Sequence, residues 1–175
     1  ILAANNNELA SQINEQALNA IIPNGPNAGL SVALWLAGTP EGVAILAANN
    51  NALGSQINPQ ALNAVIADGA YSGISVAFLL ACTPEGRAIL AANGNALGLQ
   101  INAPTLNAII PNGPNAGLSV AFWLAGTPEG VAILAANNNE LARKINSQTL
   151  NAIIPNGPNA GLSVALSLAS TPEGR

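Results

Sequence analysis

Histidine and methionine are absent from the 175-residue sequence, and cysteine occurs once, as Cys82. Without histidine, the chain lacks the side chain that most often serves as a general base or a transition-metal ligand. A single cysteine excludes an internal disulfide framework, and in its apolar segment Cys82 is predicted to be a small buried hydrophobe. We therefore expect no metal site, no cofactor and no thiol chemistry.

Charge is also scarce: charged residues make up 7% of the sequence, and the formal net charge is −4. The only basic residues are Arg87, Arg143, Lys144 and Arg175. A surface that binds nucleic acid needs clustered Lys and Arg, so no nucleic-acid partner is expected. No apolar run reaches the roughly 18 residues of a membrane-spanning helix, so no span is expected either. The cellular compartment stays open between the cytosol and secretion as an effector.

What the sequence does contain is a repeat of 44 residues. Its marker is the motif Thr-Pro-Glu-Gly, which begins at Thr39, Thr83, Thr127 and Thr171. The copies follow one another without a linker, as residues 1–44, 45–88, 89–132 and 133–175. We therefore expect a single tandem array over residues 1–175. Because the chain lacks methionine and starts and stops within the repeat, we expect it to be an excerpt of a longer protein.

Each Thr-Pro motif predicts a helix start. Thr39 can cap the first turn, Pro40 suits the first helical position, and Glu41 faces the positive end of the helix dipole. The run of asparagines at 49–51 is predicted to end or bend this helix, and a break is favoured. A second short helical piece is expected over residues 51–57.

Two further helices are predicted in each copy. One starts at the N-cap Asn58, buries Leu62, Val65 and Ile66, and is closed by a proline in the other copies. The residues from 23 to 28 read as a turn-rich connector. The other helix, 29–38, is apolar almost all round and should be the most buried, with Gly38 ending it in a left-handed conformation. A strand over residues 30–37 is the alternative.

Two or three helices per 44 residues resemble armadillo and HEAT repeats in unit length. This resemblance implies an all-α fold, an α-solenoid of four 44-residue helical repeats with two to three helices each. The Thr-Pro helix start also resembles that of ankyrin repeats, although the period is too long. A leucine-rich repeat is the rival, because Val43, Leu46, Asn51, Leu53 and Ile57 partly follow its spacing.

The recurring glutamates, Glu41, Glu85, Glu129 and Glu173, could suggest paired carboxylates for acid–base work. Each lies at a predicted helix start, where stabilising the helix dipole is a sufficient role. The glycine-rich loops lack the lysine and spacing of a phosphate-binding loop. We expect that the protein is not an enzyme.

Positions at which the copies differ are the best indication of function. One set, here called the aromatic ladder, comprises Trp35, Leu79, Trp123 and Ser167. A second, the loop ladder, comprises Asn27, Tyr71, Asn115 and Asn159. Equivalent positions line up along one face of a solenoid, so the aromatic ladder is a candidate ridge for a protein partner. Alternatively, Trp35 and Trp123 fill gaps between copies. Ser167, at the equivalent position of the last copy, argues for an exposed position instead.

These patterns predict a non-enzymatic scaffold that binds a protein partner through one face of the solenoid. A structural or self-assembling array without a distinct partner is the alternative, and a small-molecule groove between copies is a third hypothesis. No polar capping unit is visible at either end. We therefore expect Ile1, Leu2 and the helix over 161–169 to be more exposed than their internal equivalents. Such exposed ends would allow the chain to associate end to end.

Overall fold

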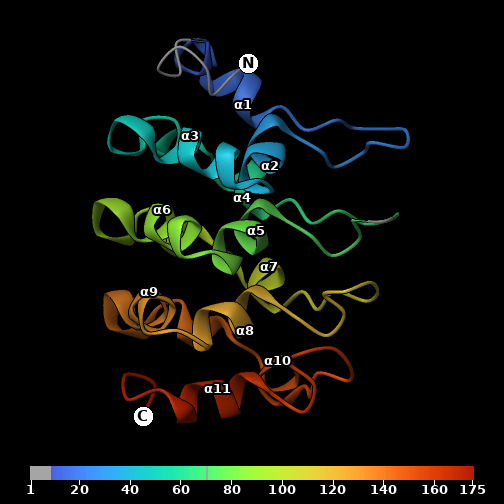
Figure 1. Ribbon diagram of the computed structural model, residues 1–175, viewed down its shortest axis with the longest axis vertical. Coiled ribbons are helices and arrows are strands. Elements are labelled where there is room, and N and C mark those ends of the chain that lie inside the picture. Colours follow the sequence, from blue (N-terminus) through green and yellow to red (C-terminus); the bar gives the residue numbers. More distant parts are fainter. Residues whose placement is uncertain (1–8, 70) are drawn as a thin grey trace.

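The computed structural model describes residues 9–69 and 71–175, and every regular element in this part of the chain is helical. The fold is all-α, as predicted, and the strand alternative for residues 30–37 is wrong. Helices of three kinds and a short 3-10 turn recur along the chain in the same order (Figure 1).

The longest helices begin at the Thr-Pro motif: α3 (Pro40–Asn51), α6 (Pro84–Asn95) and α9 (Pro128–Asn139). In each, the threonine hydroxyl accepts a hydrogen bond from the glycine amide three residues later, at 3.1, 3.0 and 3.2 Å. The predicted caps are thus confirmed. The glycine is required for packing, because a Cβ on Gly42 would collide with the carbonyl of Leu36 in the preceding helix.

The asparagine run forms a left-handed turn. Asn49, Asn50 and Asn51 have φ angles of 51°, 57° and 62°, and residues 93–95 and 137–139 repeat this geometry. Asparagine and glycine adopt the left-handed region most readily, whereas other L-residues pay about 1–2 kcal/mol each. The predicted break is confirmed.

The second short helical piece expected over 51–57 is confirmed as a separate turn of helix. It follows the left-handed turn and is a 3-10 turn, η3 (Gly54–Gln56), rather than an α-helix. The equivalent turns are η2 (Ala10–Gln12), η4 (Gly98–Gln100) and η5 (Ala142–Lys144).

Short helices capped by asparagine follow: α1 (Glu15–Asn19), α4 (Pro59–Asn63), α7 (Ala103–Asn107) and α10 (Ser147–Asn151). The predicted caps are confirmed, since Asn14, Asn58, Asn102 and Asn146 each accept a backbone amide hydrogen bond.

The predicted face of this helix is wrong in part. The helix ends at Asn63, so Val65 lies beyond it and is exposed, while Leu62 and Ile66 are buried. The chain is extended from Ala64 because the backbone of Ile66 closes the following loop, bonding to Ile74 and Gly73 at 2.9 and 2.8 Å. The helix therefore ends several residues before the position at which the other copies have a proline.

The most apolar helices are α2 (Val32–Ala37), α5 (Val76–Cys82), α8 (Val120–Ala125) and α11 (Val164–Ser170). They begin at serine N-caps rather than at the preceding glycine, whose φ is positive (86° at Gly29). In α2 the side chains of Ala33, Leu34, Leu36 and Ala37 are buried as expected, but Val32 and Trp35 are exposed. The left-handed end predicted for Gly38 is wrong: its φ of −84° is right-handed, which any residue can adopt.

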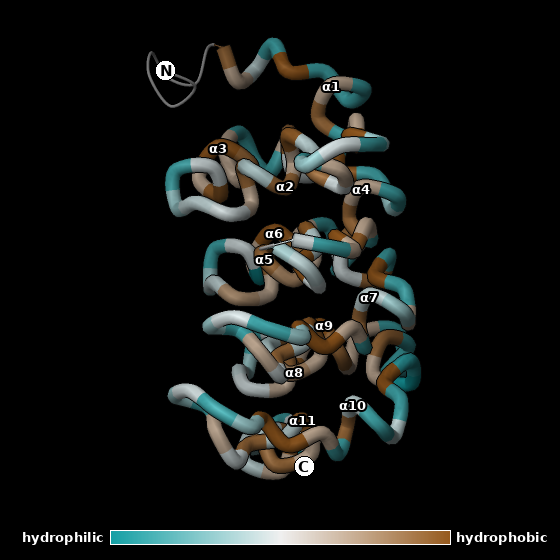
Figure 2. The backbone as a smooth tube through the Cα atoms, turned by 90° about the vertical axis from the view of Figure 1, so that its right-hand side faces the viewer, coloured by the Kyte–Doolittle hydropathy of each residue, from teal (hydrophilic) through white to brown (hydrophobic). Residues whose placement is uncertain are grey.

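Equivalent helices contact one another along the length of the molecule. α2 packs on α5, α5 on α8, and α8 on α11, while α3, α6 and α9 form a parallel row (Figure 1). Figure 2 shows the hydrophobic segments within these rows and the hydrophilic segments at the turns. The apolar core is consequently an elongated strip running from one copy to the next.

A ladder of asparagine side chains joins the copies, here called the asparagine stitch. Asn19 Nδ2 donates to the carbonyl of Gln56 at 2.7 Å, and Asn19 Oδ1 accepts from the amide of Asn58 at 2.9 Å. Asn63 and Asn107 make the same pair of bonds to the next copy. Each of these side chains is also held by a carbonyl of its own helix, at 2.8, 2.8 and 2.7 Å. The stitch therefore satisfies the amide while fixing the register between copies.

Candidate interaction surface

The aromatic ladder lies on the serine-capped helices but does not form one continuous exposed ridge. Trp35 is 57% exposed, Leu79 and Trp123 are partly buried, and Ser167 is only 7% exposed. The argument that Ser167 indicates an exposed position therefore fails, since this small side chain lies within the packed surface of α11. Of the four residues, Trp35 presents the largest apolar surface to solvent.

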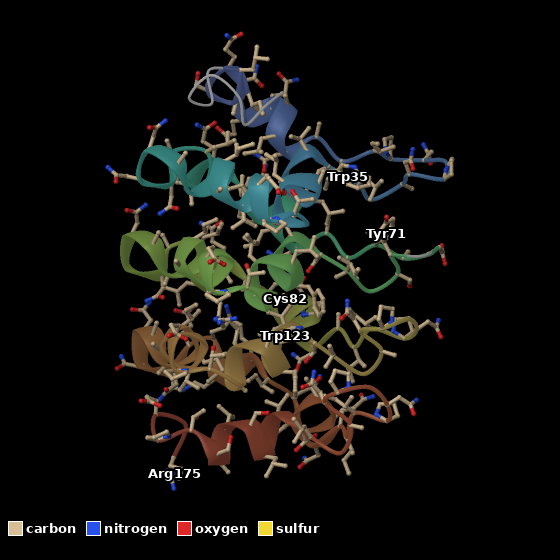
Figure 3. All side chains as sticks on the ribbon, in the orientation of Figure 1. Trp35, Tyr71, Cys82, Trp123 and Arg175 are labelled. Carbon is tan, nitrogen blue, oxygen red and sulfur yellow. The ribbon has the colours of Figure 1, made fainter. Side chains whose placement is uncertain are left out.

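Trp35 lies against the loop of the following copy. Its ring meets that of Tyr71 edge to face, with centroids 6.2 Å apart and an interplanar angle of 73°. Both side chains are exposed, and both lie on the side of the molecule that carries the connecting loops (Figure 3). The structure thus brings one member of the aromatic ladder into contact with one member of the loop ladder.

Trp123 has a different environment. Its ring makes an edge-to-face contact with Phe122, with centroids 6.0 Å apart, and packs against the apolar core. The indole Nε1 is buried and has no hydrogen-bond partner in the described part of the chain. Trp123 therefore matches the gap-filling alternative more closely than Trp35 does.

The loop ladder lies on narrow loops that project from the helices (Figure 1). In copy one, the Ile22 amide donates to the carbonyl of Leu30 at 2.9 Å, and the Ile22 carbonyl accepts from Gly29 at 2.9 Å. Asn27 and Tyr71 are exposed on their loops, whereas Asn115 and Asn159 are partly buried. Tyr71 is the one residue of this ladder with a large apolar surface.

An apolar cavity of about 190 Å³ lies between copies one and two, beside the aromatic pair. Its lining comprises Leu30, Leu34, Trp35, Gly38, Thr39, Tyr71, Ile74 and Leu79. A groove of about 470 Å³ separates the two loops nearby, with Pro26, Gly29, Val65 and Asp68 among its walls. The aromatic pair therefore lies next to concave, mainly apolar surface.

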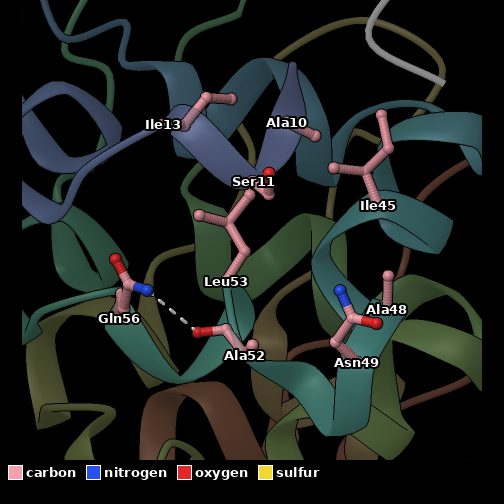
Figure 4. A pocket seen from close by; sticks show the side chains of 9 residues that line it. All are labelled: Ala10, Ser11, Ile13, Ile45, Ala48, Asn49, Ala52, Leu53 and Gln56. Carbon is pink, nitrogen blue, oxygen red and sulfur yellow. Dashed lines mark hydrogen bonds between the residues drawn. The ribbon is translucent and has the colours of Figure 1, made fainter. Parts of the chain in front are cut away.

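A smaller pocket of about 110 Å³ lies on the other side of the same junction, between η2 and α3 (Figure 4). Ile13, Ile45 and Leu53 form its apolar wall, and Gln56, which also lines the pocket, donates to the carbonyl of Ala52 at 3.2 Å. An equivalent pocket of about 40 Å³ follows at the next junction. This pocket repeats with the packing of the copies and carries no charged side chain.

The position of Val43 and Val131 holds an arginine in copies two and four, Arg87 and Arg175. Arg87 replaces the buried Val43 and Val131, and its guanidinium donates to the carbonyl of Ala81 at 2.9 Å. Burial raises the pKa of the nearby Cys82 thiol to about 12, although the positive charge of Arg87 lowers it slightly. A thiol with so high a pKa is a poor nucleophile at neutral pH.

Sequence reasoning missed the asparagine stitch. The available signal was an asparagine that recurs at the same position of every copy, at Asn19, Asn63, Asn107 and Asn151, after the predicted cap. A local pattern does not reveal the role of this asparagine, because its hydrogen-bond partners lie 37 and 39 residues further along the chain.

No family model, curated protein or solved structure matches this chain. Over residues 9–69 and 71–175, no helix combines the length and apolar character needed to cross a membrane. The same part of the chain holds no cluster of potential metal ligands.

Proposed function

We propose that the chain is an α-solenoid of four 44-residue repeats that acts as a non-enzymatic scaffold, binding a protein partner through its loop side. The solenoid interpretation is supported by the rows of equivalent helices and by the same asparagine bonds at successive junctions. In such arrays each repeat contacts only its neighbours, and the faces offer extended binding surfaces.

The observation that carries the proposal is the exposed Trp35–Tyr71 pair beside its apolar cavity. Tryptophan and tyrosine dominate the energetics of protein interfaces, because they combine a large apolar area with few rotatable bonds. The partner that fits is a protein segment with an apolar side chain, which would enter the cavity between Trp35 and Leu79. Its backbone could then lie along the groove between the loops of copies one and two.

The cavity is less suited to a small-molecule ligand. Sites for drug-sized molecules usually enclose about 300–1,000 Å³, whereas this cavity measures about 190 Å³. Catalysis has little support from the side chains, because the sequence has no histidine and the Cys82 thiol is held protonated.

The proposal can be tested by panning a phage-displayed peptide library against the purified chain and titrating the selected peptides. We expect the selected peptides to carry aromatic or large aliphatic residues. Trp35→Ala and Tyr71→Asn should each weaken their binding by tenfold or more, about 1.4–2 kcal/mol. Trp123→Phe is the matched control and should leave binding unchanged. Peptides whose affinity is unaffected by both Trp35→Ala and Tyr71→Asn would overturn the assignment of this surface.

A further inference from the structure

The two ends of the described chain expose the two halves of the junction that joins its copies internally. At the end formed by copy four, Leu166 of α11 is 50% exposed, whereas its equivalents Leu34, Phe78 and Phe122 are 6%, 1% and 6% exposed. This confirms the greater exposure expected for the last helix. The corresponding expectation for Ile1 and Leu2 falls outside the described residues.

Copy one exposes the complementary half. Ile22 is 42% exposed, but its equivalents Ile66, Ile110 and Ile154 are only 4%, 3% and 2% exposed. Leu9 and Val32 are likewise exposed, whereas the equivalent residues of the later copies are buried. Inside the chain, the isoleucine packs against a glycine of the preceding copy, as Ile66 does against Gly29. At the other end Gly161, equivalent to Gly29, faces open space.

The hydrogen-bonding groups of the asparagine stitch are also available at both ends. Asn151 donates to the carbonyl of Ser147 at 2.8 Å, as its equivalents do within their own helices. Within the described residues, however, no bond joins Asn151 to another copy. At the opposite end, the Gln12 carbonyl and the Asn14 amide correspond to the groups that Asn19 binds on Gln56 and Asn58. No hydrogen bond reaches those two groups from the described part of the chain.

We propose that copies of this chain associate head to tail, with the α10–α11 end of one chain packed on the η2–α1–α2 end of the next. Asn151 Nδ2 would donate to the partner's carbonyl at Gln12, and Asn151 Oδ1 would accept from its amide at Asn14. The new junction would reproduce the contacts that the asparagine-capped and serine-capped helices make at each internal junction. Such a contact pairs two different surfaces, so it leaves one free end of each kind and continues as an open filament.

This inference concerns the ends of the molecule and does not depend on the partner proposed for Trp35 and Tyr71. Sedimentation velocity of the purified 175-residue chain over a range of concentrations tests it directly. We expect the average mass to rise with concentration through a series of whole-number multiples of the chain. A chain that stays monomeric up to about 1 mM, where association would be weaker than about 4 kcal/mol, would overturn the proposal.

Two charged variants distinguish head-to-tail association from nonspecific aggregation. Leu166→Glu should block one end and Ile22→Glu the other, so each variant alone should be monomeric. Mixed in equal amounts, they should form a dimer and nothing larger, because each supplies the intact end that the other lacks. Continued growth of either variant, or no dimer in the mixture, would contradict the model.

Three controls make these results interpretable. Both substitutions change exposed side chains, and thermal melts by circular dichroism should show that both variants remain folded. Gln60→Glu adds the same charge at an exposed position of copy two and should associate like the wild type. Asn151→Asp keeps the shape but removes the donor to Gln12, and should weaken association by about tenfold or more. Equal association of Asn151→Asp and the wild type would remove the asparagine from the proposed junction.

Discussion

Trp35 and Trp123 occupy the same position of two copies and are followed by the same residues, Leu-Ala-Gly-Thr-Pro-Glu-Gly. Their surroundings nevertheless differ. Trp35 is exposed beside a cavity and touches Tyr71 of the next copy, whereas Trp123 packs on Phe122 with its indole nitrogen buried. The next copy offers a tyrosine to Trp35 but the shorter Asn159 at the equivalent position to Trp123. A repeated sequence therefore gives a repeated backbone, while the surroundings of an equivalent side chain differ between copies.

The largest expected effect comes from truncating the two tryptophans. Trp123→Ala should destabilise the chain by about 2–3 kcal/mol, because it opens a cavity against the core. Trp35→Ala removes a mostly exposed ring and should cost only about 1 kcal/mol. Urea denaturation followed by circular dichroism measures both values. Equal losses would contradict the distinction between the two sites.

Trp123→Phe sharpens this test. It keeps an aromatic ring against Phe122 but removes the buried N–H that lacks a partner, so stability should change little or rise. A loss as large as that of Trp123→Ala would show that the indole makes a contact which the structure does not reveal.

The left-handed turns of the helices that follow Trp35 and Trp123 should behave alike. Asn50→Ala and Asn138→Ala should each destabilise the chain by about 1–2 kcal/mol, since alanine is strained at a positive φ. Asn138→Gly serves as the control and should be nearly neutral, because Gly94 already occupies the equivalent position in α6. The same denaturation midpoints measure these effects. Alanine variants as stable as the glycine variant would refute the left-handed geometry.

The helix starts provide a similar comparison with a smaller effect. Thr39→Ala and Thr127→Ala should each cost about 1 kcal/mol, because both hydroxyls make the same capping bond. Serine at either position should restore most of the stability. If the two alanine variants lost clearly different amounts of stability, the difference between the copies would extend to the backbone.

Replacing Cys82 is expected to have the smallest effect on stability near neutral pH. Because burial raises its pKa from 9.0 to about 12, the thiol should react slowly with a thiol reagent at pH 8 and readily after unfolding. The folded state holds the proton more tightly than the unfolded state. Its contribution to stability is therefore complete below pH 9 and is lost as the pH rises towards 12. Cys82→Ser should flatten this part of the pH profile, and rapid labelling of the folded chain would contradict the burial.

What the sequence could predict depended on how far each interaction reaches along the chain. The threonine and asparagine caps bond to amides three residues away, so local patterns sufficed. The asparagine stitch joins residues in neighbouring copies, and its bonds could not be inferred without the packing. At Gly38 the sequence itself indicates a backbone that does not require glycine, because Cys82 and Ser170 occupy the equivalent position.

The exposure of each aromatic residue was harder to predict. Trp35 contacts Tyr71, which lies in the next copy on a loop that differs from the corresponding loops. No periodicity within one copy contains this information. The candidate surface consequently rests on a contact between two copies, and only the three-dimensional structure reveals it.

The asparagine stitch also bears on how such a chain could evolve. The asparagine of one copy recognises only main-chain groups of the next, so the bond forms equally with Gln56, Gln100 and Lys144 as acceptor residues. Side chains at these positions can be substituted without breaking these hydrogen bonds. A duplication or deletion of whole 44-residue units would therefore leave every new neighbour compatible with the old one, so the length of the array could change without a second, compensating mutation.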